Sequence, residues 1–136
     1  MFFFAGSLTA GNKLGDSITV ELGQRHQIES SALNETRSLM VHLPKGYATS
    51  SQQYPVVYVL DGESHFQHAV NAMQILSEME RMPASIIVGI PNNPGTRGRD
   101  LARNRSPFKQ FIRDEVIGFV EKNYRTSGLR TLFGHS

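Results

Sequence analysis

The sequence ends in Gly134-His135-Ser136, in which a serine follows a glycine at the spacing found around nucleophilic serines. In the pattern G-x-S-x-G, a strand ends in a sharp turn that exposes the serine hydroxyl, and small flanking residues relieve backbone crowding. The residues before Gly134 are mostly apolar, as expected for a strand. The pattern therefore predicts that residues 129–136 deliver a nucleophilic serine, with only its first three positions present.

Two other serines stand at the same spacing from a glycine, in Gly15-Asp16-Ser17 and Gly62-Glu63-Ser64. The first has no buried strand in front of it. The second has Phe66 where the pattern needs a glycine, and its serine lies beyond a turn that ends a strand. The context therefore favours Ser136, and the alternative for Ser136 is a turn at a strand end without chemistry.

Composition limits the classes of protein that the sequence can encode. A chain of 136 residues has the length of one small domain. Its net charge of +2 comes from scattered residues of both signs, which is not the basic patch of a nucleic-acid-binding protein. Without cysteine there is no disulfide or thiolate metal site, and no stretch approaches the roughly 20 apolar residues of a membrane span. We therefore predict neither a nucleic-acid partner nor a membrane span.

Residues 1–16 are predicted to be a tail, apolar at first and then small and polar. A secretory signal needs a basic start and an apolar core of about 7 to 15 residues, and neither is convincingly present. Two interpretations stay open, a remnant of a signal and a loosely ordered chain end. The compartment, whether cytoplasmic, periplasmic or secreted, is accordingly left unassigned.

Two runs alternate between apolar and polar residues, the period of half-buried strands. The first carries Ile18, Val20 and Leu22 on one side, and the second carries Leu39 and Val41. We predict an antiparallel opening of a sheet from these two runs.

The next strands are apolar on successive residues, over Val56–Leu60 and Ile86–Ile90. Such runs are typical of parallel strands that are covered on both faces. Helical apolar stripes follow each of them, from Phe66 to Met79 and from Phe108 to Val120. Strands that alternate with helices predict an α/β protein, with a mostly parallel sheet, an antiparallel start and flanking helices.

These segments, taken in order, resemble the putative-esterase family of α/β-hydrolases, which includes esterase D-like enzymes and siderophore esterases. The segments that carry the resemblance are Leu43-Pro44-Lys45-Gly46-Tyr47, Tyr54-Pro55-Val56-Val57-Tyr58-Val59-Leu60-Asp61-Gly62, Ile86-Ile87-Val88-Gly89-Ile90-Pro91-Asn92, Arg97-Gly98-Arg99-Asp100, Asn123-Tyr124-Arg125-Thr126 and Gly134-His135-Ser136. The resemblance runs from about Thr36 to Ser136. It implies that residues 17–136 are the N-terminal, incomplete half of an α/β-hydrolase domain, truncated at the nucleophile.

The resemblance also implies a mechanism, in which Ser136 attacks a small-molecule carboxylic ester and becomes acylated. One oxyanion donor would be the backbone N–H of Glu63, in the loop that contains Gly62. The acid and the histidine of the triad follow the serine in this fold, as does the residue with the second donor. None of the five histidines would then be the catalytic base, and this chain alone is expected to be inactive. We expect no cofactor and no metal, since His65 and His68 lack a third ligand nearby.

The resemblance suggests that Asp61, Arg97, Arg99 and His135 bind the substrate, with Arg97, Arg99 and Asp100 as a rim that recognises an anionic or catecholate-bearing acyl group. The two arginines follow the fourth strand, on the carboxyl side of the sheet where ligands of α/β folds bind. The alternative, which the sequence favours, is a solvated loop with a local Arg–Asp contact.

A second hypothesis comes from a different class, a noncatalytic or assembly-dependent α/β fragment. If the chain ends in a central strand, Leu132 and Phe133 lie on an exposed edge, which is a template for association. We therefore also expect self-association through that edge.

Overall fold

Five strands form one mixed sheet in the computed structural model, which describes Phe2 and residues 11–135. In the sheet the strands lie in the order β1-β2-β4-β3-β5. Their bounds are β1 (Gln24–Ser30), β2 (Glu35–His42), β3 (Tyr54–Leu60), β4 (Ile86–Ile90) and β5 (Thr126–Phe133). β3 pairs in parallel with both β4 and β5, while β2 runs antiparallel to β1 and β4. The predicted α/β fold, with an antiparallel start before its parallel strands, is confirmed.

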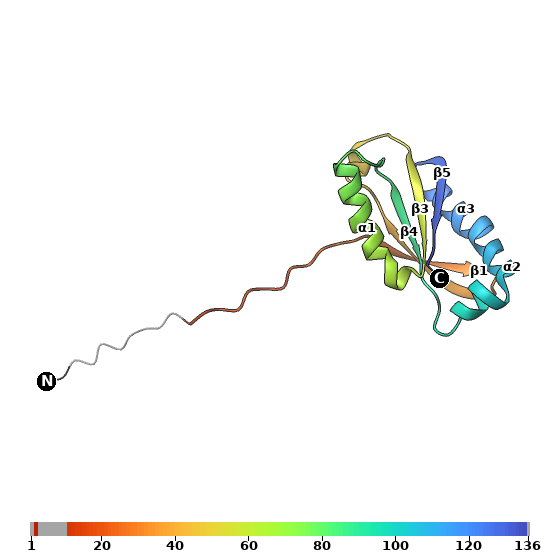
Figure 1. Cartoon of the computed structure of the whole chain (residues 1–136), viewed down its shortest axis with the longest axis horizontal. Helices are drawn as coiled ribbons and strands as arrows, with labels where there is room; N and C mark the ends of the chain where they lie inside the picture. The colour runs from red at the N-terminus through yellow and green to blue at the C-terminus, as the bar shows by residue number, and fades with distance from the viewer. Residues whose placement is uncertain (1, 3–10, 136) are drawn as a thin grey trace.

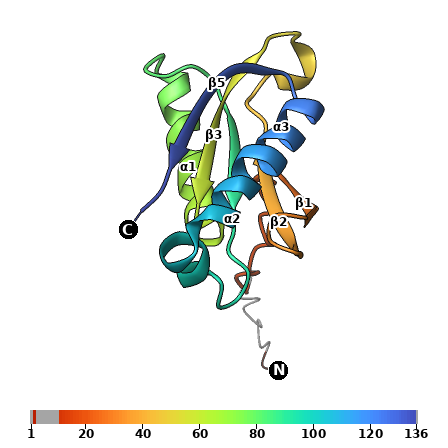
Figure 2. The same cartoon turned by 90° about the vertical axis from the view of Figure 1, so that its right-hand side faces the viewer.

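Helices cover both faces of this sheet (Figures 1 and 2). One face carries α1 (Gly62–Glu78), whose buried side chains Phe66 and Val70 pack against Val59 and Ile87. The other face carries a continuous helical stretch formed by α2 (Arg105–Gln110), the π-helical segment η3 (Phe111–Val116) and α3 (Ile117–Asn123). Two short segments complete the helical elements, the 3₁₀ turn η1 (Tyr47–Thr49) and the π-helical turn η2 (Arg99–Arg103). No helix among the described residues is both long enough and apolar enough to cross a bilayer.

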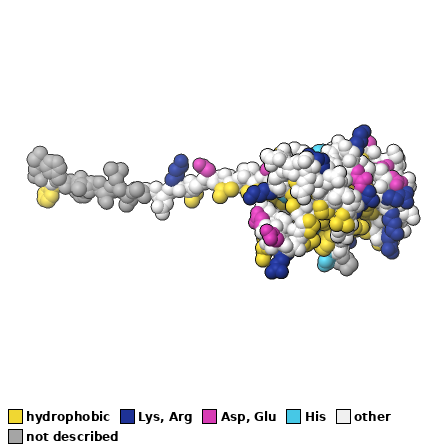
Figure 3. Space-filling model, turned by 90° about the horizontal axis from the view of Figure 1, so that it is seen from above, with side chains coloured by type: hydrophobic (Ala, Val, Ile, Leu, Met, Phe, Trp, Pro, Cys, Tyr) yellow, Lys and Arg dark blue, Asp and Glu magenta, His cyan; other side chains and the backbone are white. Residues whose placement is uncertain are grey.

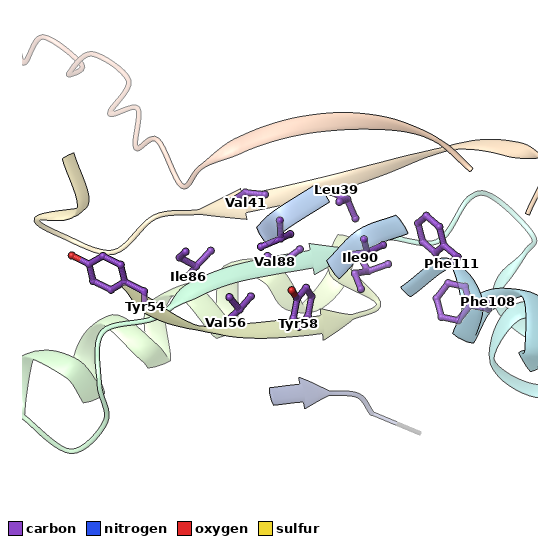
Figure 4. Packing of buried hydrophobic residues seen from close by; sticks show 12 residues of the cluster. Leu39, Val41, Tyr54, Val56, Tyr58, Ile86, Val88, Ile90, Phe108 and Phe111 are labelled. Carbon is purple, nitrogen blue, oxygen red and sulfur yellow. The ribbon is translucent and has the colours of Figure 1, made fainter. Parts of the chain in front are cut away.

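The larger core lies between the sheet and the stretch from α2 to α3 (Figure 4). Alternate residues of β3, Val56 and Tyr58, point into it, and so do Ile86 and Val88 of β4. Val57 and Val59 lie toward the α1 side. Continuous apolar strands therefore supply both cores at once, which is the physical reason for their composition.

The strand predicted over Ile18–Leu22 is wrong. Residues 11–23 have no helix or strand, and Ile18 and Val20 are 92% and 71% exposed. These apolar side chains belong to an extended arm that leaves the globular part (Figures 1 and 3). The partner of β2 is instead β1, whose register begins at Gln24↔Val41. Alternation of apolar and polar residues does not by itself locate a strand, because a strand forms only where a neighbouring strand can pair with it. The boundary at residue 17 stays a prediction.

β5 is an edge strand of the sheet that the described residues form, since it pairs with β3 on one side only. Leu132 and Phe133 on this edge are 58% and 48% exposed. The register between β3 and β5 shifts between Tyr54 and Val56, where Gly128 has a φ of 84°. Glycine adopts this left-handed backbone without steric cost, so it accommodates the irregularity.

Candidate active site

The turn at the end of β3 is formed by Asp61-Gly62-Glu63, at the carboxyl edge of the sheet. Asp61 has a left-handed backbone, with φ 50° and ψ 46°, which is uncommon for a residue other than glycine. It stands at the N-cap position of α1, yet its side chain makes no capping hydrogen bond there. The carboxylate contacts Arg97 and Asn92 instead. Unusual backbone geometry at a helix start thus coincides with a polar network.

Gly62 allows this turn to pack directly against the end of β4. A Cβ at this position would lie 2.8 Å from the backbone N of Ile90 and 2.9 Å from the carbonyl carbon of Gly89. Both atoms belong to the backbone of a buried strand and cannot move aside easily. Gly62 is therefore needed because of the close approach of two chain segments.

Glu63 contributes two different groups to this turn. Its backbone N–H lies in the first turn of α1, where a helix provides no acceptor of its own. Its carboxylate accepts hydrogen bonds from the backbone N of Asn92, at 3.0 Å, and from the side-chain Nδ2 of Asn92, at 2.9 Å. The same Nδ2 donates to Asp61 Oδ1 at 2.6 Å. Asn92 thus holds both carboxylates of the turn.

Arg97 joins the turn to the segment after β5. Its Nε and Nη2 donate to the two oxygens of Asp61, at 2.7 and 3.0 Å. Nη2 also donates to the backbone carbonyl of His135 at 3.2 Å. Hydrogen bonds from Arg97 lower the pKa of the Asp61 carboxyl below its ordinary value, against the opposing effect of burial. Asp61 is accordingly a carboxylate at neutral pH.

Arg99 and Asp100 lie in a separate ionic cluster. Arg99 contacts Asp100 at 2.6 Å and Glu35 at 2.8 Å, and both contacts raise its pKa. Asp100 also accepts from Arg37, at 2.7 Å. Burial raises the pKa of Asp100, but the hydrogen bonds from Arg99 and Arg37 outweigh that effect and hold it below its ordinary value. The local Arg–Asp contact is present, although Asp100 is only 1% exposed rather than solvated.

Arg37 is the centre of this cluster and is fully buried. Its Nη1 also contacts Glu35 at 3.0 Å, and its Nη2 donates to the carbonyl of Pro91 at 3.0 Å. The guanidinium carbon lies 5.5 Å from the ring centres of both Phe108 and Phe111. Because Pro91 precedes Asn92, this cluster fixes the start of the loop that holds the Asp61–Glu63 turn.

The segment after β5 reaches this edge of the sheet. A Cβ at Gly134 would lie 3.2 Å from Leu60 Cδ1, so the segment passes beside the end of β3. The ring of His135 lies 6.0 Å from that of His65 on α1, which in turn lies 6.3 Å from Phe133. Ser136 lies outside the described residues. The residue before it, His135, is linked to the Asp61–Glu63 turn through Arg97.

An apolar groove of about 380 Å³ runs along α1 beside this segment, between the helix and strands β3 and β5. His65 and Phe133 are among the residues that line it, together with His68. Over the described residues there is no group of three or more His, Cys, Asp or Glu side chains that could hold a metal ion.

The sequence profile of the family described as "Putative esterase" matches residues 30–136. This match covers most of the chain, and the chain belongs to that family of α/β-hydrolases. The predicted family is therefore confirmed.

Solved structures of relatives share the fold. An IroE-like serine hydrolase from Shewanella oneidensis is 36% identical with a TM-score of 0.77, over 83% of this chain and 42% of that one. The siderophore hydrolase EstB from Aspergillus nidulans has a TM-score of 0.70 at 20% identity, over 91% of this chain and 51% of that one.

A further relative is the uncharacterized protein YbbA of Bacillus subtilis. It is 36% identical over 58 residues, which is 42% of this chain and 23% of that protein. The chain thus spans about half or less of the length of these relatives.

Proposed function

We propose that this chain carries the nucleophile and one oxyanion donor of a serine carboxylesterase. The observation that supports this most directly is the bond from Arg97 to the carbonyl of His135. It brings the residue before Ser136 to the same edge as the Asp61–Glu63 turn, where the proposed donor lies. Acyl transfer needs a hydroxyl that attacks the ester and an N–H that stabilises the resulting oxyanion, and both would lie at one edge of the sheet.

In the proposed reaction, the Ser136 hydroxyl oxygen attacks the carbonyl carbon of a small-molecule ester. The former carbonyl oxygen, which carries the negative charge of the tetrahedral intermediate, accepts a hydrogen bond from the N–H of Glu63. Collapse of the tetrahedral intermediate breaks the bond to the alcohol, which leaves with the proton that the general base took from Ser136, and the acyl group stays on Ser136. Water, with its proton taken by the same base, then attacks the acyl group, which releases the acid and restores the serine hydroxyl. The general base follows the serine in this fold. We therefore expect no turnover by these residues alone.

The proposal extends to a substrate rim of Asp61, Arg97, Arg99 and His135. Of these, His135 is exposed at the carboxyl edge, which supports a place for it near the substrate, whereas the side chains of Asp61 and Arg97 are already paired with each other. The contacts of Arg99 with Glu35 and Asp100 favour a structural role for that residue.

Turnover of p-nitrophenyl acetate tests the proposed function. The chain alone is expected to give none. The same chain, extended after Ser136 by the corresponding remainder of the 36%-identical Shewanella hydrolase, is expected to turn over the ester. A fluorophosphonate probe should then modify Ser136, as located by mass spectrometry. Ser136→Ala should remove both signals, and a folded extended protein whose turnover survives this substitution would contradict the proposal.

A second candidate function is that of a noncatalytic, assembly-dependent fragment. The exposed apolar edge formed by Leu132 and Phe133 favours it, because unpaired strand edges associate with other strands. The two candidates differ in the outcome of the extended-chain assay, in which a noncatalytic fragment would show no serine-dependent turnover.

Self-association through β5 is the prediction that arises from this edge. The isolated chain should form dimers or larger species in light scattering, and Leu132→Lys should shift it toward the monomer, since a charge on an edge strand opposes pairing. Leu14→Lys serves as the control. Leu14 is 91% exposed in the N-terminal arm, away from the sheet edge, so the charge alone should have no such effect. A monomeric wild-type chain would count against the prediction.

A further inference from the structure

We infer that Arg97 is a positioning residue, which fastens the segment before Ser136 to the Asp61–Glu63 turn. The inference rests on the proposed function, because positioning is useful only if Ser136 and the N–H of Glu63 act on one ester. In this role Arg97 orients the chain segment that carries the nucleophile and does not itself bind the substrate.

The geometry of the Arg97 guanidinium carries the inference. Two of its nitrogens, Nε and Nη2, face the two oxygens of Asp61 in a bidentate arrangement, at 2.7 and 3.0 Å. This fork is specific to arginine and fixes the orientation of the group as well as its distance. Nη2 then extends to the carbonyl of His135. One planar group therefore fixes two chain segments relative to each other.

Asp61 is the buried end of this link. The Asp61 side chain is 8% exposed, whereas that of Arg97 is 52% exposed. A buried carboxylate needs donors, and Asp61 has three, two from Arg97 and one from Asn92. Its backbone stays left-handed only because its surroundings hold it there. Loss of Arg97 would remove two of the three donors.

The charged groups around Asp61 lie on two elements, the loop after β4 and α1. Arg97 lies in the loop after β4, and His65 of α1 also lowers the pKa of Asp61. Glu63 of α1 shares the amide of Asn92 with it. The positive charge of Arg97 thus neutralises the carboxylate of Asp61, and both of the guanidinium nitrogens that face it are already hydrogen-bonded. A substrate anion would have to compete with this carboxylate, which favours positioning over binding.

Hydrogen exchange of the unextended chain, measured by mass spectrometry, tests the link directly. Arg97→Gln should speed exchange in peptides from the Asp61–Phe66 turn and from the C-terminal segment together, by about two- to fivefold for an ion pair of partial exposure. Arg97→Lys should restore part of this protection, since it keeps the charge without the fork. Adding Asp61→Asn to Arg97→Gln should cause little further change, because both remove the same link.

Arg113→Gln provides a matched control. Arg113 forms the same kind of bidentate pair with Asp114, at 2.6 and 2.8 Å, on an exposed part of the helical stretch. Its loss should leave both peptides unchanged. Exchange at the C-terminal segment that is equal in wild type and Arg97→Gln would overturn the inference.

The kinetics of the extended chain separate positioning from binding. Arg97→Gln should lower kcat by roughly tenfold or more with KM within about twofold, since misplacement of reacting groups slows the chemical step. A raised KM with unchanged kcat would show substrate binding and overturn the inference. If the extended chain is inactive while Arg97→Gln still loosens both peptides, the proposed function fails and the link stands. The two failures are therefore distinguishable.

Discussion

Asp100→Ala is expected to lower the free energy of unfolding by about 3 to 5 kcal/mol, the range for breaking a buried ion pair on one side. Arg37 would stay inside the protein with no exposed surface and without its closest carboxylate, at 2.7 Å. Its Nε already lacks a hydrogen-bond partner within the described residues. Glu35 and the carbonyl of Pro91 would remain, but Glu35 is partly exposed and shared with Arg99.

Urea denaturation followed by circular dichroism measures this loss. Asp114→Ala is the matched control, because Asp114 pairs with Arg113 at the surface, where both side chains are largely exposed. Exposed pairs contribute only about 0 to 1 kcal/mol. If the free energy of unfolding falls by the same amount in the two variants, the burial of Arg37 does not make the loss of its partner more destabilising, which would contradict the prediction.

The same cluster predicts a pH dependence. The pKa of Asp100 is lower in the folded chain than its ordinary value. The Asp100 carboxylate therefore contributes fully to the free energy of unfolding at pH values above its pKa in the unfolded chain, which is about 3.9. This contribution is lost as the pH falls through the folded-state pKa. The stability lost on acidification below about pH 4 should accordingly be smaller in Asp100→Ala than in the wild type.

Gly62→Ala is expected to cost about 1 to 3 kcal/mol, as for other overpacked sites, and to abolish turnover in the extended chain. The new methyl group would meet backbone atoms of Ile90 and Gly89 at 2.8 and 2.9 Å. Either β4 or the turn must shift, and the N–H of Glu63 moves with the turn.

Gly118→Ala is the matched control, since it makes the same substitution inside α3 in open space. Alanine in a helix is about 0.5 to 1 kcal/mol more favourable than glycine, so this variant should gain stability. Urea midpoints and ester turnover of both variants check the pair of expectations. Full activity in Gly62→Ala would contradict the oxyanion role proposed for this turn.

The sequence was sufficient to predict the parallel strands and α1. Continuous apolar runs such as Val56–Leu60 have few alternatives to a buried strand, and the stripe from Phe66 has the period of a helix. The arm at Ile18 shows where local sequence is insufficient to predict a strand. The alternation at residues 18–22 fits a strand as well as the runs that do form strands. Which residues pair with β2, however, depends on where β2 ends, and local sequence does not specify this.

The polar network was harder to predict, because its partners are far apart in the chain. The sequence marks Arg97 and Asp61 as separate candidates, but their hydrogen bond joins residues that are 36 positions apart. Asn92 was part of a family segment without a role, and Arg37 had no signal beyond its charge. A lone arginine in an alternating strand predicts an exposed side chain, whereas this one is fully buried. Only the fold brings Asp100 to it.

The Arg37–Asp100 bond also has a consequence for synthesis of the chain on the ribosome. The two residues are separated by 63 positions, and translation at about 5 to 20 residues per second makes this a delay of roughly 3 to 13 seconds. For most of that interval β4 has not yet been made either, so the β1–β2 hairpin lacks both its sheet neighbour and Asp100, and an isolated hairpin is marginally stable in water. The nascent hairpin is therefore expected to be open to solvent, and to chaperones, until β4 is available to pair with β2, and Arg37 gains Asp100 only after that.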